Sequence, residues 1–212
     1  MMKFNLFLLI SLLGTILQAQ INFYQMPDDV VLPESVFKEV QDQIIQQGAQ
    51  IVLYDTISQS DTILYKVGIK PGLGNRANPY QRFINQKGQE FPEKLFGLDD
   101  IDKPRFVNFW FTTCMPCIKE IPDLNELKEE FGEEVEFVAI TFDSEKQVEK
   151  FLESRPIHFE HITNQKEALG TYGVRSYPMN MLLDKDAKIV WVDGMLNFSK
   201  WEVEMEIKKL IQ

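Results

Sequence analysis

The spacing of apolar residues predicts a helix near the start of the chain. In residues 33–47 apolar side chains recur at the spacing of one helix face, and they are Val36, Phe37, Val40, Ile44 and Ile45. Pro33 suits a first helical turn and Gly48 a stop, so we expect this stripe to face a core. Residues 20–32 show no such period, and we expect them to be irregular and extended.

Two strands and a loop are expected next. Residues 49–55 and 62–68 are rich in Ile, Val, Leu and Tyr, and the polar residues between them predict the turn of a hairpin. Residues 70–79 combine Pro, Gly and Asn, which is typical of a loop. We therefore expect an N-terminal helix-plus-hairpin extension in residues 20–79 and a second domain in residues 80–212.

Strands and helices alternate from residue 105 onwards. Apolar runs predict strands at 105–110, 135–142, 157–162, 179–183 and 188–193. Apolar residues at helical spacing predict helices up to residue 131, at 144–154, at 165–172 and from 199. Pro122 is expected to kink the first of these helices. Such alternation requires parallel strands, and the final hairpin adds antiparallel ones, so the prediction is a three-layer α/β sandwich with a mixed sheet.

Composition narrows the classes of partner. Of the 212 residues 44% are hydrophobic, and the net charge is -10. The chain can therefore form a packed core. Its negative charge repels nucleic acid and anionic membrane surfaces, so we predict no nucleic-acid partner.

The first nineteen residues have the features of a targeting segment. Lys3 supplies a positive charge, an apolar run follows, and Ala19 is a small residue at a plausible cleavage site. An uncleaved membrane anchor is the alternative, although the run is shorter than the roughly 20 residues of a spanning helix. We expect residues 1–19 to be a signal peptide. The protein is then exported, periplasmic and soluble after cleavage, and tethered to the membrane only if the segment is retained.

The chain has only two cysteines, Cys114 and Cys117. In an exported protein a cysteine pair commonly forms a structural disulfide, but so small a loop gains little stability from closure. A zinc site needs more ligands, and the two histidines, His158 and His161, lie about 40 residues further along. The spacing favours a redox-active dithiol over a metal site or an inert disulfide, and we predict neither a metal nor a cofactor.

The position of the pair at the start of a predicted helix indicates how it reacts. The free N–H groups and the dipole of a helix N-terminus stabilise a thiolate. Cys117 lies one turn later and is expected to be deeper in the fold, so Cys114 is assigned as the attacking thiol and Cys117 as the resolving thiol. Glu120, one further turn along, is either the acceptor of the Cys117 proton or an ordinary solvated carboxylate.

The segment around the cysteines reads Asn-Phe-Trp-Phe-Thr-Thr-Cys-Met-Pro-Cys at 108–117 and Lys-Glu-Ile-Pro at 119–122. This segment resembles the exported TlpA/ResA-like thiol-disulfide oxidoreductases of the thioredoxin superfamily. The resemblance covers roughly residues 82–212 and implies a thioredoxin-like fold, with the nucleophile at Cys114, the resolving cysteine at Cys117 and a buried glutamate at Glu120. Asn108 falls where cytoplasmic thioredoxins have a buried acid, and Thr113 departs from a common tryptophan.

The dipeptide Tyr177-Pro178 matches the cis-proline loop of the same family. From the residues alone, Pro178 could simply open a strand. A cis bond there would turn the Tyr177 backbone toward an extended substrate. We expect these two residues to bind the substrate together with Trp110, Met115 and Pro116.

These features predict an exported thiol-disulfide oxidoreductase that reduces disulfides of exported proteins and is itself reduced by a membrane thiol-electron donor. Two alternatives stay open: a thioredoxin-like binding module with a vestigial cysteine pair, and a copper(I)-handling protein that uses soft sulfur ligands. A peroxiredoxin is disfavoured, because Val107 and Phe111 stand where its Pro-x-x-x-Thr-x-x-Cys pattern needs proline and threonine.

Overall fold

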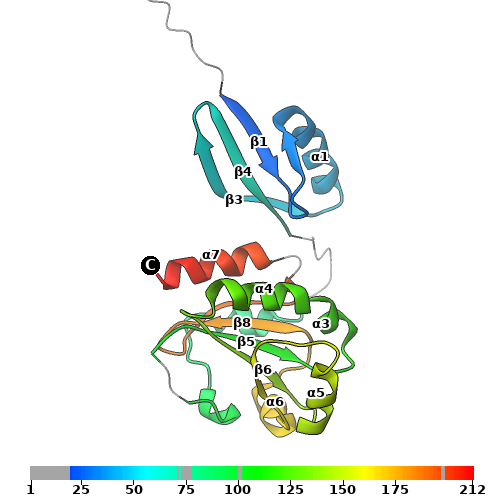
Figure 1. The fold of residues 1–212 in the computed structure, drawn as a ribbon, viewed down its shortest axis with the longest axis vertical. Coiled ribbons are helices and arrows are strands. Elements are labelled where there is room, and N and C mark those ends of the chain that lie inside the picture. Colours follow the sequence, from blue (N-terminus) through cyan, green and yellow to red (C-terminus); the bar gives the residue numbers. More distant parts are fainter. Residues whose placement is uncertain (1–19, 71, 73–77, 100–101, 197–198) are drawn as a thin grey trace, which may run out of the picture.

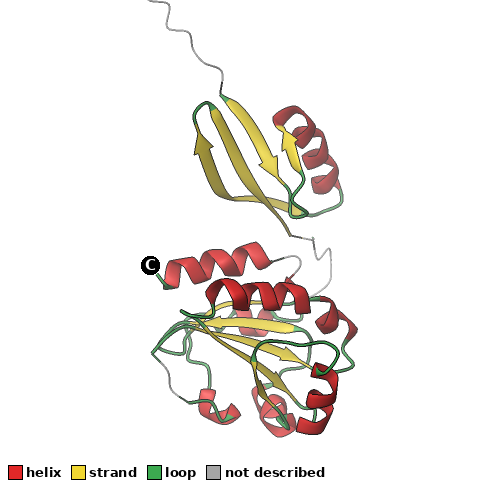
Figure 2. Ribbon diagram, in the orientation of Figure 1, coloured by secondary structure: helices red, strands yellow, loops and turns green. Residues whose placement is uncertain are grey.

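The structure, a computed structural model, describes residues 20–70, 72, 78–99, 102–196 and 199–212. The predicted signal peptide and most of the predicted loop at 70–79 lie outside these residues. Within them the chain forms one sheet of four strands and one of five (Figures 1 and 2). Every helix in these ranges is too short or too polar to span a bilayer.

The first sheet carries one helix. Its strands are β1 (Ile21–Gln25), β2 (Val31–Pro33), β3 (Gln50–Gln59) and β4 (Thr62–Lys70), in the order β2-β1-β4-β3, and its helix is α1 (Glu34–Gln46). β3 and β4 pair antiparallel. The predicted helix and hairpin are thus confirmed, although β3 extends into the expected turn.

The expectation that residues 20–32 are irregular is wrong, because they contain β1 and the start of β2. β1 pairs antiparallel with β2 and in parallel with β4, which begins about 40 residues later. Strand formation depends on such neighbours more than on intrinsic preference. A segment of five residues therefore carries no local period that would reveal it.

Only part of the predicted apolar stripe of α1 is buried. Phe37 is 3% exposed and stacks on Tyr24 of β1, with ring centroids 3.9 Å apart. Val36 and Ile45 belong to the same predicted stripe but are 41% and 51% exposed. The helix therefore covers its sheet with a narrower face than the sequence predicts.

The second sheet has β5 (Arg105–Trp110) at its centre. The other strands are β6 (Glu136–Thr141), β7 (Glu160–Ile162), β8 (Met179–Leu183) and β9 (Ile189–Asp193), and the order is β7-β6-β5-β8-β9. β5, β6 and β7 run parallel, and β8 and β9 pair antiparallel. All six residues of β5 are buried, as expected for a strand that is covered on both faces.

Helices cover both faces of this sheet, which confirms the predicted three-layer sandwich (Figure 1). They are α2 (Gln81–Ile84), α3 (Met115–Lys119), α4 (Ile121–Phe131), α5 (Glu145–Leu152), α6 (Lys166–Tyr172) and α7 (Lys200–Leu210), with a short 3-10 helix at Glu93–Phe96. Phe106 packs with side chains of α4 and α7, whereas Val107 and Phe109 pack with those of α2 and α6. The two cores form because successive strand residues point to opposite faces.

The helix after the cysteines is divided in two. α3 ends at Lys119 and α4 begins at Ile121, with Glu120 between them. Pro122 has no N–H to continue the hydrogen-bond ladder of α3, but it fits the first turn of α4, where proline is tolerated. The predicted kink is therefore a complete break, and Glu120 lies at the joint.

The strand β5 begins with a buried cation. Arg105 is 2% exposed and forms ion pairs with Glu93 and Glu136. Its guanidinium also donates to the carbonyl oxygen of Asp99 at 2.8 Å. A buried arginine is stable only when its charge is compensated in this way. These contacts therefore fix the N-terminal end of β5.

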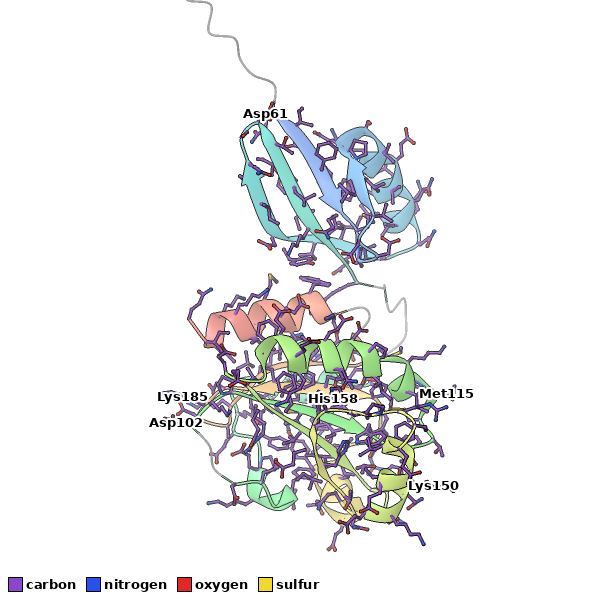
Figure 3. The ribbon with its side chains drawn as sticks, viewed as in Figure 1. Asp61, Asp102, Met115, Lys150, His158 and Lys185 are labelled. Atoms are coloured by element: carbon purple, nitrogen blue, oxygen red, sulfur yellow. A yellow bond between two sulfur atoms is a disulfide. The ribbon has the colours of Figure 1, made fainter. Side chains whose placement is uncertain are left out.

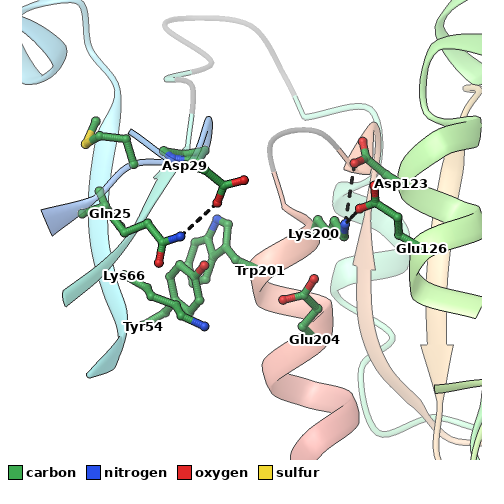
Figure 4. Close-up of a pocket in the computed structure, with 12 residues that line it drawn as sticks. Gln25, Asp29, Tyr54, Lys66, Asp123, Glu126, Lys200, Trp201 and Glu204 are labelled. Atoms are coloured by element: carbon green, nitrogen blue, oxygen red, sulfur yellow. Dashed lines mark hydrogen bonds and ion pairs between the residues drawn. The ribbon is translucent and has the colours of Figure 1, made fainter. Parts of the chain in front are cut away.

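The two sheets are linked through α7. Trp201 of α7 stacks on Tyr54 of β3, with ring centroids 5.0 Å apart, and Glu202 forms an ion pair with Lys70 at 2.5 Å. A cavity of about 340 Å³ opens beside Trp201 (Figure 4). The cavity is lined by residues of the first sheet and of the helices α4 and α7, but by neither cysteine. It therefore lies between the first sheet and these helices and is not part of the predicted redox centre.

Candidate active site

Cys114 and Cys117 form a disulfide at the start of α3, with their Cα atoms 5.2 Å apart. Cys114 caps the helix, because the backbone N–H of Cys117 donates to its Sγ at 3.2 Å. The same N–H would stabilise a thiolate on Cys114 once the disulfide is reduced. This contact supports Cys114 as the attacking thiol.

Burial does not distinguish the two cysteines. Each is 3% exposed, so the expectation that Cys117 lies deeper is not reproduced. The adjacent Met115 is 63% exposed and projects from this end of the molecule (Figure 3), and Pro116 is half-buried. These two residues form the surface next to the disulfide.

Glu120 is fully buried, which is unusual for a glutamate. Its Oε1 accepts a hydrogen bond from Asn108 Nδ2 at 3.0 Å. Its Oε2 accepts from Asn180 Nδ2 at 3.2 Å and from the Leu196 N–H at 3.0 Å. The alternative of a solvated carboxylate is therefore wrong, and the carboxyl lies among amides instead of water.

Burial raises the pKa of Glu120 from 4.5 to about 8. The hydrogen bonds from Leu196, Asn180 and Asn108 oppose that rise, and the nearby Asp123 carboxylate adds to it. A carboxyl with this pKa exchanges its proton close to neutral pH. Glu120 is also tied to the disulfide helix, since its N–H donates to the Cys117 carbonyl oxygen at 3.3 Å.

Two buried asparagines face each other beneath this carboxyl. Asn108 of β5 and Asn180 of β8 are directly paired across the two strands, and neither is exposed. Asn108 Nδ2 also donates to Asn180 Oδ1 at 2.8 Å, and Asn180 Nδ2 donates to the Gly194 carbonyl oxygen at 2.7 Å. The sequence singled out Asn108 but not Asn180, whose signal is one amide within the otherwise apolar β8.

The Tyr177–Pro178 peptide bond is cis, as the resemblance implies. The Pro178 carbonyl oxygen accepts a hydrogen bond from the Tyr80 hydroxyl at 2.8 Å. The Tyr80 ring lies so close to Gly194 that a Cβ there would collide with it. Tyr80 carries no motif in the sequence, where its region only marks the expected start of the second domain.

Three aromatic rings border the same loop. Phe111, which precedes the cysteines, lies 5.1 Å from Phe142 and 5.3 Å from Tyr177 between ring centroids. Phe142 is 37% exposed, and with Tyr177 it lines a groove of about 500 Å³ that continues to α5 and α6. Nothing in the sequence distinguishes Phe111 and Phe142 from core residues, because each is part of an apolar run that contains a strand.

Trp110 does not belong to this surface. It is 1% exposed and packs against the rings of Phe151 and His161. The prediction that Trp110 contacts substrate is therefore wrong, because its side chain is enclosed by the core behind the site.

Among the residues that the structure describes, no group of three or more His, Cys, Asp or Glu residues is arranged to hold a metal ion.

Residues 77–192 match the AhpC/TSA family. The chain belongs to this family. The thiol-disulfide oxidoreductase ResA of Bacillus thuringiensis is 40% identical over 128 residues, which cover 52% of this chain and 74% of that protein. The thioredoxin-like protein YneN of Bacillus subtilis is 32% identical over 117 residues, 49% of this chain and 69% of that protein.

A solved structure of similar fold is a putative thiol:disulfide interchange protein DsbE from Chlorobium tepidum. It gives a TM-score of 0.50 at 22% identity, covering 54% of this chain and 84% of that one. The resemblance to thioredoxin-fold thiol-disulfide oxidoreductases is thereby confirmed, and this AhpC/TSA family member is an enzyme of that class.

Proposed function

We propose that this AhpC/TSA family member reduces disulfides of exported proteins through Cys114 and Cys117. The observation that carries the proposal is Glu120, a fully buried carboxyl with a pKa of about 8 at the end of the disulfide helix. An inert disulfide needs no proton acceptor, and a buried carboxyl is unfavourable for folding. A resolving thiol, in contrast, must lose its proton before it can attack.

The first step joins the enzyme to its substrate. The Cys114 thiolate attacks one sulfur of a substrate disulfide, so that a Cys114–substrate S–S bond forms and the substrate S–S bond breaks. The leaving substrate sulfur takes a proton from solvent. The N–H of Cys117, which contacts Cys114 Sγ, stabilises the thiolate before the attack.

The second step releases the product. Cys117 gives its proton to ionised Glu120, and its sulfur attacks Cys114 Sγ. The Cys114–Cys117 bond forms, the mixed disulfide breaks, and the second substrate sulfur leaves as a thiolate. The substrate thus gains the two electrons that the cysteine pair loses.

The cycle requires an external reductant and a surface for protein substrates. We assign the reductant to a membrane thiol donor, which returns two electrons to the disulfide in the periplasm after export and signal cleavage. Met115, Pro116, Tyr177 and Pro178 are the proposed substrate contacts. Met115 and Pro116 lie between the two cysteines in the chain, and Tyr177 and Pro178 form the cis-proline loop, in which Tyr177 is half-buried and Pro178 buried. Peroxidase chemistry stays disfavoured on the sequence pattern alone.

Trapping tests this proposal. Cys117→Ala should accumulate mixed disulfides with exported proteins through Cys114, and Cys114→Ala should accumulate none. The unmodified protein should reduce insulin, and its disulfide should have a reduction potential above the roughly -300 mV below which structural disulfides lie. Absence of both trapped partners and insulin reduction would rule out the proposed function and leave the binding module.

A further inference from the structure

We propose that Asn180 is a positioning residue for the disulfide exchange, because its amide clamps the Glu120 carboxyl against Asn108 and the backbone of residues 194–196. This inference rests on the proposed function of the Cys114–Cys117 pair. Asn180 touches neither sulfur in the contacts described above. It acts through Glu120, because its N–H donation opposes the effect of burial and so increases the fraction of that carboxyl that can receive a proton.

The hydrogen-bond geometry leaves the Asn180 amide only one way to sit. One of its two N–H groups donates to Glu120 Oε2 at 3.2 Å and the other to the Gly194 carbonyl oxygen at 2.7 Å. Its Oδ1 accepts from Asn108 Nδ2 at 2.8 Å. Every polar atom of the Asn180 side chain is therefore engaged, and a turn of the amide would place its oxygen against the oxygens of Glu120 and Gly194.

This arrangement favours the ionised carboxyl over the neutral acid. Asn108, Asn180 and Leu196 all present N–H groups to the two oxygens of Glu120. A proton on either oxygen would have to displace one of these donors. The three donors therefore counteract burial, which on its own would keep Glu120 protonated and unable to accept the Cys117 proton.

Packing alone gives no reason for an amide at this position. The other residues of β8 are apolar and fully or almost fully buried. An asparagine in such a strand is disfavoured unless its hydrogen bonds are satisfied. Here the hydrogen bonds of Asn180 are satisfied by the Glu120 carboxyl, by Asn108 and by the Gly194 carbonyl oxygen.

Titratable groups near Glu120 also affect its pKa, independently of the hydrogen bond from Asn180. Asp123 of α4 raises the pKa of Glu120. Tyr80 faces both Glu120 and Asp193 of β9, and burial with these two carboxyls raises the pKa of Tyr80 to about 12, so Tyr80 stays neutral near pH 8. Burial also raises the pKa of Asp193, although Gly194 and Lys70 oppose that rise.

The test is the pH dependence of the second step in isolation. The reduced protein is mixed with Ellman's reagent in a stopped-flow instrument. Attack by Cys114 releases one coloured thiolate, and attack by Cys117 on the mixed disulfide releases a second. We expect the rate of the second phase to rise with ionisation of Glu120. In Asn180→Leu its midpoint should move to higher pH by about one unit, which makes the phase roughly tenfold slower at neutral pH.

Three further variants distinguish positioning from general damage to the core. Asn180→Ser keeps one donor and should shift the midpoint less than Asn180→Leu. Leu182→Ala truncates a buried side chain of the same strand that has no group to hydrogen-bond Glu120, so it should lower stability and leave the midpoint unchanged. Asp123→Asn removes a negative charge and should move the midpoint to lower pH.

An infrared titration of the disulfide form gives a second readout that needs no turnover. The protonated-carboxyl band that disappears in Glu120→Gln identifies Glu120, and its midpoint should rise in Asn180→Leu. A second phase with the same midpoint in Asn180→Leu and the unmodified protein would overturn the role of Asn180 while leaving the proposed function intact. A missing second phase in the unmodified protein would instead overturn both.

Discussion

The indole of Trp201 lies directly on the backbone of Gly68. A Cβ at Gly68 would collide with the Trp201 ring, which is only 8% exposed. This contact joins β4 of the first sheet to α7 of the second unit. Gly68→Ala should therefore force the two apart, and we expect the free energy of unfolding in urea to fall by about 1–3 kcal/mol.

A double-mutant cycle identifies the cause of that loss. If the clash with the indole is responsible, Gly68→Ala should cost much less in a Trp201→Ala background. Gly170→Ala is the matched control, because a Cβ at this helical glycine meets no atom within 4 Å. It should be neutral or slightly stabilising. Equal losses in both backgrounds would contradict the contact.

Glu120 makes stability fall as the pH rises. Below pH 4.5 the carboxyl is protonated in both the folded and the unfolded chain. Between 4.5 and about 8 the unfolded chain releases the proton while the folded chain retains it, so unfolding becomes easier across this window. Relative to Glu120→Gln, the unmodified protein should lose up to roughly 5 kcal/mol between about pH 4 and about pH 9, since one unit is about 1.4 kcal/mol.

Urea unfolding at several pH values checks this prediction with the disulfide intact. Other groups titrate in both proteins, and their contributions cancel in the difference between them. A constant offset reports altered hydrogen bonds in the variant. A difference that does not change across the window would mean that Glu120 keeps an ordinary pKa.

Arg105 should be far more important for stability than an exposed ion-paired lysine. Arg105→Met leaves the carboxylates of Glu93 and Glu136 without their shared buried cation. We expect a loss of about 3–5 kcal/mol in the free energy of unfolding. Lys38→Met removes the exposed partner of Glu34 and should leave stability unchanged within error. Similar losses in the two variants would contradict this view of the core.

The aromatic cluster should matter for protein substrates only. Phe142→Ala removes an exposed ring beside Tyr177, and we expect KM for a protein disulfide to rise about tenfold, roughly 1.4 kcal/mol. The rate with Ellman's reagent should stay the same, because that small disulfide needs no extended surface. Leu95→Ala is the control, since Leu95 is also 37% exposed but lies on the short 3-10 helix. An unchanged KM in Phe142→Ala would show that the groove lined by Phe142 and Tyr177 does not bind the substrate.

Local sequence patterns predict the parts of this protein that are determined locally. The strand Arg105–Trp110 is observed with the predicted bounds, because an apolar run bounded by Pro104 is sufficient evidence for it. The cysteine pair follows from its spacing in the same way, whereas a buried Glu120 and a cis Pro178 are implied only by the resemblance to thiol-disulfide oxidoreductases. Pro122 predicts a disturbance in the helix, although tertiary packing turns the expected kink into a break.

The missed features all depend on contacts between distant residues. Glu120 and Asn180 are 60 positions apart, and Tyr80 and Pro178 are 98 apart. A lone asparagine in a strand, or a tyrosine after a loop, shows no periodicity that reveals its partner. β1 is missed for the same reason, since β2, α1 and β3 separate it in the sequence from its parallel neighbour β4. Trp110 is misplaced because proximity to the cysteines in sequence does not indicate whether a side chain reaches the surface, and its ring is enclosed by Phe151 and His161.

The hydrogen bond from Tyr80 to Pro178 has a consequence for where the redox unit begins. The last strand of the first sheet ends at Lys70, which is ion-paired to Glu202. Further along the chain, Tyr80 donates a hydrogen bond to the cis-proline loop. A protein shortened to start at Arg82 would retain both cysteines, Glu120 and the complete five-stranded sheet. It would nevertheless lack the hydroxyl that donates to the Pro178 carbonyl oxygen of this loop. The smallest fully assembled catalytic unit therefore starts upstream of its most recognisable motifs, within the segment that connects it to the N-terminal sheet.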